Sequence, residues 1–156
     1  MSQWHHMRRA VELSALGMRG GHGGPFGAVI VRAGEIIAEA HNEVLSSHDP
    51  TAHAEVLAIR RAAAALKRHH LSDCEIYTSC EPCPMCLGAI YWSRLARIYY
   101  ANTRADAAAI GFDDQFFYEE LALPLSARRV PMVALGREEA QAIFAEFAAA
   151  PDRRIY

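Results

Sequence analysis

Two short motifs constrain this chain more than any other feature of its sequence. The first is His53-Ala54-Glu55, and the second is Pro82-Cys83-Pro84-Met85-Cys86. Cysteines three positions apart share one face of a helical turn, so both sulfur atoms can reach one ion. The start of a helix also favours the thiolate over the thiol. The fold is therefore expected to bring His53, near the start of one helix, to the cysteines at the start of another.

A set of one histidine and two cysteines is typical of zinc, which accepts sulfur and imidazole ligands in tetrahedral geometry. His53, Cys83 and Cys86 would leave the fourth position open, as in catalytic rather than structural sites. Zinc there would lower the pKa of a bound water molecule. Glu55 is the candidate that carries the proton from this water to a substrate. It cannot share the face of His53 on an ideal helix, so we expect it to act from the first helical turn.

Two other interpretations of the motifs stay open. Cys80 could provide a fourth ligand and close a structural zinc site. Cys83 and Cys86 could instead form a redox pair, which would leave His53 and Glu55 unused. The combination of H-x-E with P-C-x-x-C favours neither, because it is the signature of zinc deaminases that act on nucleobases.

The pattern of apolar residues predicts an α/β fold. Helices are expected over 4–18, 51–69, 82–92, 105–110, 114–121 and 138–147, and strands over 26–31, 36–38, 75–79, 98–101 and 130–135. The strand, helix and strand around the second motif form a βαβ unit, so these two strands should be parallel. Pro131 cannot donate a ladder hydrogen bond, which places the last strand at an edge. The sum is a mixed sheet of about five strands with helices on both faces, in a single domain over 1–156.

Charge and cysteine spacing exclude several classes of protein. The net charge of −2 at pH 7 gives little support for a protein that mainly binds nucleic acid, because phosphate contacts need a basic surface. Residues 1–21 lack the apolar core of a signal peptide, and no segment reaches the length of a membrane span. Three of the four cysteines lie within seven residues, too close together for disulfide bonds among them to stabilise a fold of this size. We expect a cytoplasmic protein that does not bind a membrane.

Almost the whole chain resembles the bacterial guanine deaminases of the cytidine deaminase superfamily. The residues that carry the resemblance are 24–31, 49–56, 77–90, 110–114 and Tyr156. The two zinc motifs are shared across the superfamily and do not select a substrate. The stretch Gly111-Phe112-Asp113-Asp114 and the terminal Tyr156 are the more discriminating parts.

The resemblance implies a three-layer α/β/α sandwich, one zinc ion per subunit and hydrolysis of guanine to xanthine and ammonia. It also implies a homodimer in which the C-terminal segment, about 137–156, crosses to the partner and closes its active site. The implied zinc ligands are His53, Cys83 and Cys86, the implied catalytic residue is Glu55, and the implied substrate-binding residues are Asn42, Asp114, Tyr156, Phe26 and Ala54.

Some of these residues also have plain structural interpretations. Asn42 could only cap a turn, and either Asp113 or Asp114 could cap a helix. The glycine-rich run 20–24 could be a flexible loop or could let the backbone approach a ligand. His48 and Trp92 are open between pocket and non-pocket roles.

Three other functions compete with guanine deamination. A nucleoside deaminase and a tRNA adenosine deaminase would use the same zinc site. A structural zinc module would have a saturated site and no hydrolytic activity.

Overall fold

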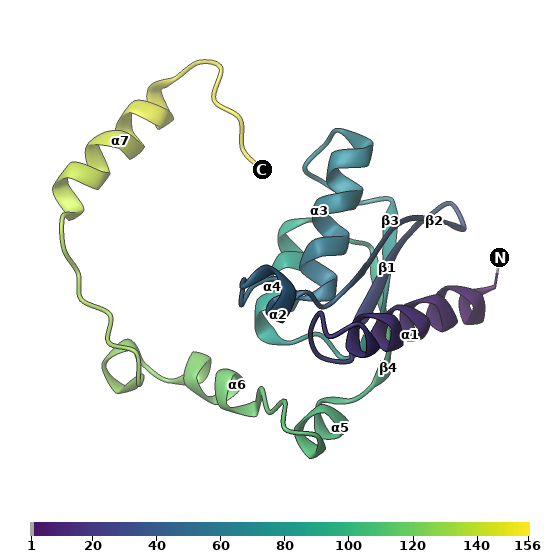
Figure 1. Ribbon diagram of the computed structural model, residues 1–156. Helices are drawn as coiled ribbons and strands as arrows, with labels where there is room; N and C mark the ends of the chain where they lie inside the picture. Colours follow the sequence, from purple (N-terminus) through teal and green to yellow (C-terminus); the bar gives the residue numbers. More distant parts are fainter. Residues whose placement is uncertain (1) are drawn as a thin grey trace. The chain divides into compact units, whose positions relative to one another are not determined.

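The computed structural model describes residues 2–156 and separates into two compact units, Met1–Gln115 and Phe116–Tyr156 (Figure 1). The first unit contains the β-sheet and both motifs. The second consists of helices and connecting segments. None of the helices in residues 2–156 is long and apolar enough to cross a membrane.

A four-stranded mixed sheet forms the centre of the first unit. Its strands are β1 (Gly27–Arg32), β2 (Glu35–His41), β3 (Cys74–Cys80) and β4 (Arg97–Asn102), in the order β2-β1-β3-β4. β1 is antiparallel to both of its neighbours, whereas β3 and β4 are parallel, as the βαβ pattern predicts. The mixed sheet confirms the predicted α/β fold.

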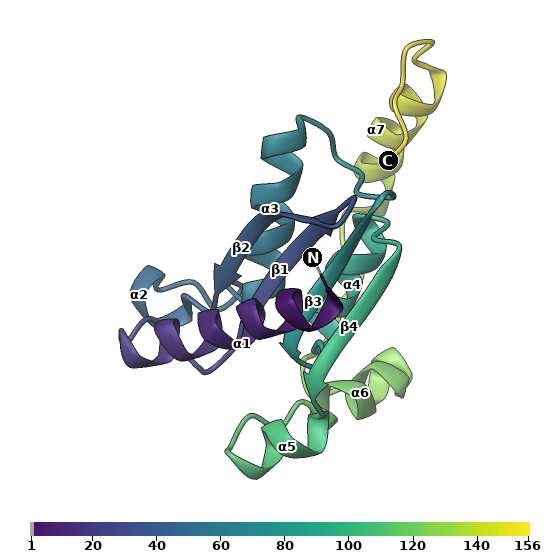
Figure 2. The same ribbon diagram turned by 90° about the vertical axis from the view of Figure 1, so that its right-hand side faces the viewer.

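Helices cover both faces of this sheet, which confirms the three layers. α1 (Gln3–Arg19) lies on one face, and α3 (Ala54–Leu66) and α4 (Pro84–Trp92) lie on the other (Figure 2). The alternating side chains of β1 explain this arrangement. Val29 packs with the α1 residues, and Ile30 packs with the α3 residues. Both faces of β1 are therefore buried, which is why its sequence is a continuous apolar run.

The helix predicted over 51–69 begins later, at Ala54. Asp49 accepts hydrogen bonds from the backbone N–H and the hydroxyl of Thr51, at 2.8 and 2.7 Å, and so forms a turn before the helix. A short helix that the sequence did not indicate, α2 (Val44–Ser47), precedes this turn. It ends at His48, which has a φ of 53° and an exposed side chain. α5 (Arg104–Ala109) follows β4.

The predicted fifth strand, over 130–135, is wrong. The second unit contains α6, which begins at the boundary (Gln115–Ala122), a 3₁₀ turn (Leu125–Ala127) and α7 (Arg137–Ala149), and none of its residues is in a strand. Pro131 removes one ladder donor, and a strand needs a neighbouring strand to satisfy the other backbone groups. Instead, Arg128 donates hydrogen bonds to the carbonyl oxygens of Leu121 and Leu123.

Candidate active site

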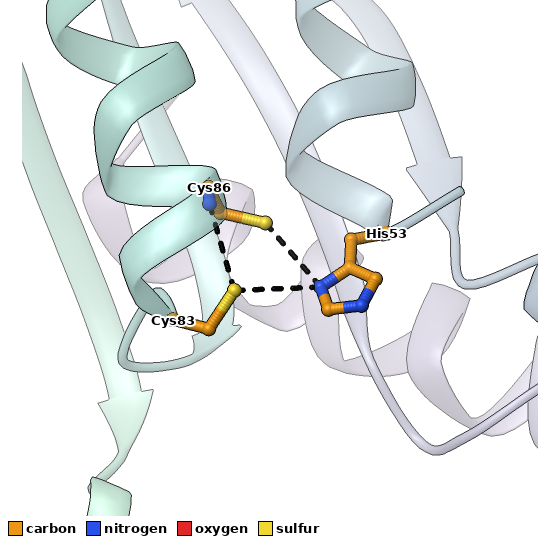
Figure 3. A group of neighbouring side chains, drawn as sticks. All are labelled: His53, Cys83 and Cys86. Carbon is orange, nitrogen blue, oxygen red and sulfur yellow. Dashed lines mark hydrogen bonds between the residues drawn. The ribbon is translucent and has the colours of Figure 1, made fainter. Parts of the chain in front are cut away.

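His53 stands at the junction between a loop and α3. It is the N-cap residue of this helix, with extended backbone angles, and its ring is half-buried. The backbone N–H of His53 donates to the carbonyl of Thr51 at 2.8 Å, so the turn that delays α3 also fixes His53. The imidazole points from the N-terminal end of α3 toward α4 (Figure 3).

The two cysteines occupy the first turn of α4. Cys83 is the N-cap residue and Pro84 follows it as the first helical residue, a position where proline is preorganised. Cys83 Sγ accepts from the backbone N–H of Cys86 at 3.5 Å. The helix start therefore presents Cys83 Sγ and Cys86 Sγ on the same side, facing His53 (Figure 3).

The three donor atoms have the spacing of a tetrahedral zinc site. His53 Nδ1 lies 3.6 Å from Cys83 Sγ and 3.4 Å from Cys86 Sγ, and all three atoms lie within 4.8 Å of one another. Zinc bonds of about 2.3 Å to sulfur and about 2.0 Å to nitrogen would separate tetrahedral sulfur and nitrogen ligands by about 3.5 Å. The donor set and its geometry therefore fit zinc.

The protonation of the two thiols at this site also fits a bound cation. Hydrogen bonds from Cys86 and His53 lower the pKa of the Cys83 thiol to about 4. The neighbouring Cys83 sulfur, burial and Glu55 raise the pKa of the Cys86 thiol, so the second sulfur does not ionise beside the first. A bound divalent cation would allow both sulfur atoms to be thiolates.

Glu55 lies in the first turn of α3, as expected from its position two residues after His53. Its side chain is buried, and Cys86 Sγ lies 3.3 Å from its Oε2. Burial raises the pKa of this carboxyl group, because an apolar environment disfavours the charged form. A carboxyl group with a raised pKa beside the ligand set is suited to accept and return a proton.

Cys80 is not a member of the ligand group, although it lies three residues before Cys83. Its Sγ faces the carbonyl oxygen of Thr103 at 3.7 Å, and burial raises its pKa to about 11. The potential metal ligands found together in residues 2–156 are His53, Cys83 and Cys86. A three-residue set is the kind that leaves a position for water.

Two aromatic rings lie beside the glycine-rich loop. Phe26 and Phe112 meet edge to face, with ring centroids 5.0 Å apart. A Cβ atom on Gly24 would approach both rings to about 3 Å. The sequence suggested Phe26 as a pocket residue but not Phe112, because nothing in the sequence showed that residues so far apart meet.

The structure separates the roles of the two neighbouring aspartates. Asp113 Oδ1 accepts from the backbone N–H of Gln115 at 3.0 Å, so Asp113 makes the turn that leads into α6. Asp114 is half-buried, and its pKa is raised by burial and by the negative charge of Cys83. Of the two, Asp114 is therefore the one not engaged in this turn.

Three further candidates differ in their surroundings. Asn42 is 6% exposed at the end of β2, and the next backbone N–H, that of Glu43, donates to the carbonyl of Ala52 at 3.0 Å. Asn42 therefore lies beside the loop that carries His53. Ala54 is fully buried at the start of α3, and Tyr156 is an exposed residue of the second unit.

Glu81 was not among the residues predicted for the site. Its carboxylate accepts from the backbone N–H of Arg104 at 3.0 Å and pairs with the Arg104 guanidinium at 3.2 Å. Its backbone N–H donates to the carbonyl of Asn102 at 2.8 Å. These bonds tie the segment just before Cys83 to the start of α5. The only sequence signal for this connecting role is that Glu81 directly precedes the second motif.

Comparison with known proteins supports a deaminase. Residues 2–102 match the cytidine and deoxycytidylate deaminase zinc-binding region. The chain belongs to this deaminase family. The match includes all three ligands and Glu55, so the centre described above is that of a zinc-binding deaminase domain.

Within this deaminase family, the chain is similar to guanine deaminase of Bacillus subtilis (strain 168). The two sequences are 57% identical over 125 residues, which cover 80% of each chain. The X-ray structure of guanine deaminase from Bacillus subtilis superposes with a TM-score of 0.96 at 48% identity, covering 100% of this chain and 99% of that chain.

Two other relatives match smaller parts of the chain. A solved structure, NE0047 in complex with 2,6-diaminopurine, is 39% identical with a TM-score of 0.67, over 70% of this chain and 61% of that chain. A tRNA-specific adenosine deaminase of Aquifex aeolicus (strain VF5) is 48% identical over 77 residues, 49% of this chain and 51% of that protein.

Proposed function

We propose that this deaminase hydrolyses guanine to xanthine and ammonia, in purine catabolism or salvage. One observation carries the proposal: its similarity to guanine deaminase extends over the entire chain, including the segments outside the zinc motifs. A structure from studies of tRNA:A34 deaminases also covers 91% of this chain, but at 30% identity and a TM-score of 0.65, against 48% and 0.96 for the guanine deaminase.

The reaction divides between the metal and the side chains around it. One zinc ion per subunit, held by His53, Cys83 and Cys86, would lower the pKa of a water molecule and so provide the nucleophile. Glu55 accepts the proton of the water that attacks C2 of guanine and donates it to N3. Glu55 then takes the remaining proton from the hydroxyl group formed on C2 and transfers it to the 2-amino group, the C2–N bond breaks and ammonia leaves. The oxygen atom of water remains on C2 of xanthine.

Recognition of the base is assigned to side chains around the ligand set. Asp114 can accept hydrogen bonds from N1–H and from the amino group of guanine, which lie side by side. Asn42 hydrogen-bonds the base, and Phe26 and Ala54 line the pocket. A pocket built on such polar contacts discriminates strongly against bases that lack the matching groups.

A substrate panel on the purified protein tests this function. We expect xanthine and ammonia from guanine without added RNA, and much slower turnover of guanosine, adenine and cytosine. Efficient turnover of guanosine would instead indicate a nucleoside deaminase. Inosine formation in tRNA with no turnover of free guanine would indicate the tRNA-specific activity.

We also propose a homodimer in which residues 137–156 are exchanged between subunits. The support comes from the second unit itself, in which no residue is buried. Large apolar side chains on α7 are open to solvent: Ile143 is 63%, Phe144 is 72% and Phe147 is 47% exposed. Exposed aromatic residues on an amphipathic helix are typical of a surface that packs against another element. In this arrangement Tyr156 completes the active site of the partner.

Deleting residues 152–156 is expected to reduce kcat/KM for guanine by more than about tenfold, because the polar contacts of Tyr156 would be lost. The melting temperature should change little, since these residues are exposed and contribute little to the core. Steady-state kinetics and thermal unfolding measure the two effects. Unchanged catalytic efficiency would show that Tyr156 does not contribute to the active site.

Mixing two variants of low activity tests the exchange itself. One partner is the protein without residues 152–156, and the other is full-length Glu55→Gln. With exchanged tails, a mixed dimer combines an intact Glu55 with an intact tail in one site. Random pairing makes about half of the dimers mixed, so co-refolding should restore about a quarter of the wild-type activity. Mixed dimers without activity would show that each tail serves its own subunit.

We assign the enzyme to the cytoplasm. All four cysteines are free thiols, and two of them are assigned to the metal. A reducing compartment keeps such thiols available for zinc.

A further inference from the structure

The glycine-rich loop before β1 contains one glycine that the backbone itself does not require. Gly21 has a φ of 72°, in the left-handed region where glycine is favoured. Gly23 lies outside that region, so its φ would tolerate a side chain. A side chain at Gly23 is excluded by Asn42, because a Cβ atom on Gly23 would overlap the carboxamide oxygen of Asn42.

The atoms that lie closest to a Cβ atom placed on Gly23 all belong to Asn42. The added Cβ atom would also lie 3.0 Å from Asn42 Cγ and 2.9 Å from the Asn42 carbonyl oxygen, and these three atoms are its nearest neighbours. The loop backbone thus forms a wall against one side of the Asn42 side chain.

Hydrogen bonding fixes which way round the carboxamide of Asn42 lies. Its Oδ1 accepts from the backbone N–H of Val44 at 3.0 Å. An amide nitrogen cannot accept from an N–H group, so the positions of Oδ1 and Nδ2 are determined. The turn-capping interpretation of Asn42 is therefore correct, but it uses only the oxygen atom.

The nitrogen atom of the same carboxamide is left without a bond to the protein. Asn42 is 6% exposed, and no acceptor within residues 2–156 receives a hydrogen bond from its Nδ2. Nδ2 itself keeps contact with solvent, so its two N–H groups are available to an acceptor that enters the site. The backbone of Asn42 is held too, by donation from its N–H to the carbonyl of Phe26 at 2.9 Å.

We propose that Gly23 is a positioning residue that holds the Asn42 carboxamide in this one orientation, so that Nδ2 acts only as a hydrogen-bond donor to the bound base. The inference rests on the proposed function for the identity of the base. Because Oδ1 is committed to Val44, the site selects bases that present an acceptor, a ring nitrogen or an oxo group, at the edge that meets Asn42. An unconstrained asparagine could offer its oxygen instead and would accept an amino group there.

Gly23→Ala should increase KM for guanine about tenfold or more, with a smaller change in kcat, because the displaced carboxamide loses a bond to the base but not to the reacting atoms. Gly21→Ala is the matched control in the same loop. Its Cβ atom would meet nothing within 4 Å, so strain should lower the melting temperature without changing KM. Asn42→Asp keeps an acceptor for Val44 and removes the donor, so KM should rise to a similar extent.

A double-mutant cycle shows whether Gly23 acts through Asn42. In the background of Asn42→Ala, Gly23→Ala should change KM much less than in the wild type, because the carboxamide that it displaces is gone and only the 2.9 Å approach to the backbone carbonyl oxygen of residue 42 remains. Equal effects of Gly23→Ala in both backgrounds would overturn the proposal, as would a wild-type KM in Gly23→Ala itself.

The orientation can be followed without any turnover. In a ¹⁵N–¹H spectrum, the side-chain amide signals of Asn42 should shift in Gly23→Ala and stay in place in Gly21→Ala. Unmoved signals in Gly23→Ala overturn the positioning role even in an active enzyme. If guanine is not a substrate but the signals shift as expected, the proposed function fails while the role of Gly23 stands.

Discussion

Glu55→Gln is expected to lower kcat for guanine by about 10²–10⁴-fold, the usual contribution of a positioned general acid and base. The substitution keeps the size of the side chain and removes its ability to exchange a proton. Glu55 is not among the three metal donors, so the zinc content should match that of the wild type. Xanthine formation, measured by absorbance, and metal analysis of the same sample test both expectations.

Two further measurements make this test specific. Glu35→Gln is a suitable control, because Glu35 is an exposed residue at the start of β2, and it should leave rate and zinc content unchanged. Circular dichroism should show the same fold for both variants. A near wild-type rate in Glu55→Gln would exclude the proton-transfer role, whereas loss of zinc would show that Glu55 supports the metal instead.

The sequence was most informative where a signal is local. The spacing of Cys83 and Cys86 places two sulfur atoms on one helical turn, and the apolar run of β1 reflects burial on both faces of the sheet. The ligand set and the mixed sheet follow from such signals. His53 could be assigned because its motif opens a helix, although the 3.4–3.6 Å separations depend on the fold.

Features that depend on tertiary contacts could not be predicted in the same way. The edge-to-face contact of Phe26 with Phe112 joins segments far apart in the chain. The orientation of the Asn42 carboxamide depends on a backbone N–H two residues later and on the wall formed by Gly23. The run over 130–135 has the composition of a strand but no neighbouring strand, and composition alone does not reveal that.

Cys86→Ser is expected to abolish both metal binding and activity. Cys86 is fully buried and supplies one of three donors, and a serine hydroxyl is a poor ligand for zinc compared with a thiolate. Loss of the metal removes the activation of water, which is worth several kcal/mol or at least about 10³-fold in rate. Zinc released on denaturation, measured with a colorimetric chelator, should fall from about one ion per chain to less than about a tenth of that.

Cys80→Ser is the matched variant for this experiment. Cys80 is also buried, at 6% exposure, and its substitution introduces the same change of sulfur to oxygen three residues before Cys83. The new hydroxyl can donate to the carbonyl of Thr103, which the thiol faces now. We therefore expect wild-type zinc content and turnover. If Cys80→Ser instead lost zinc to the same degree as Cys86→Ser, Cys80 would be a fourth ligand, and the closed site would leave no position for the water that deamination requires.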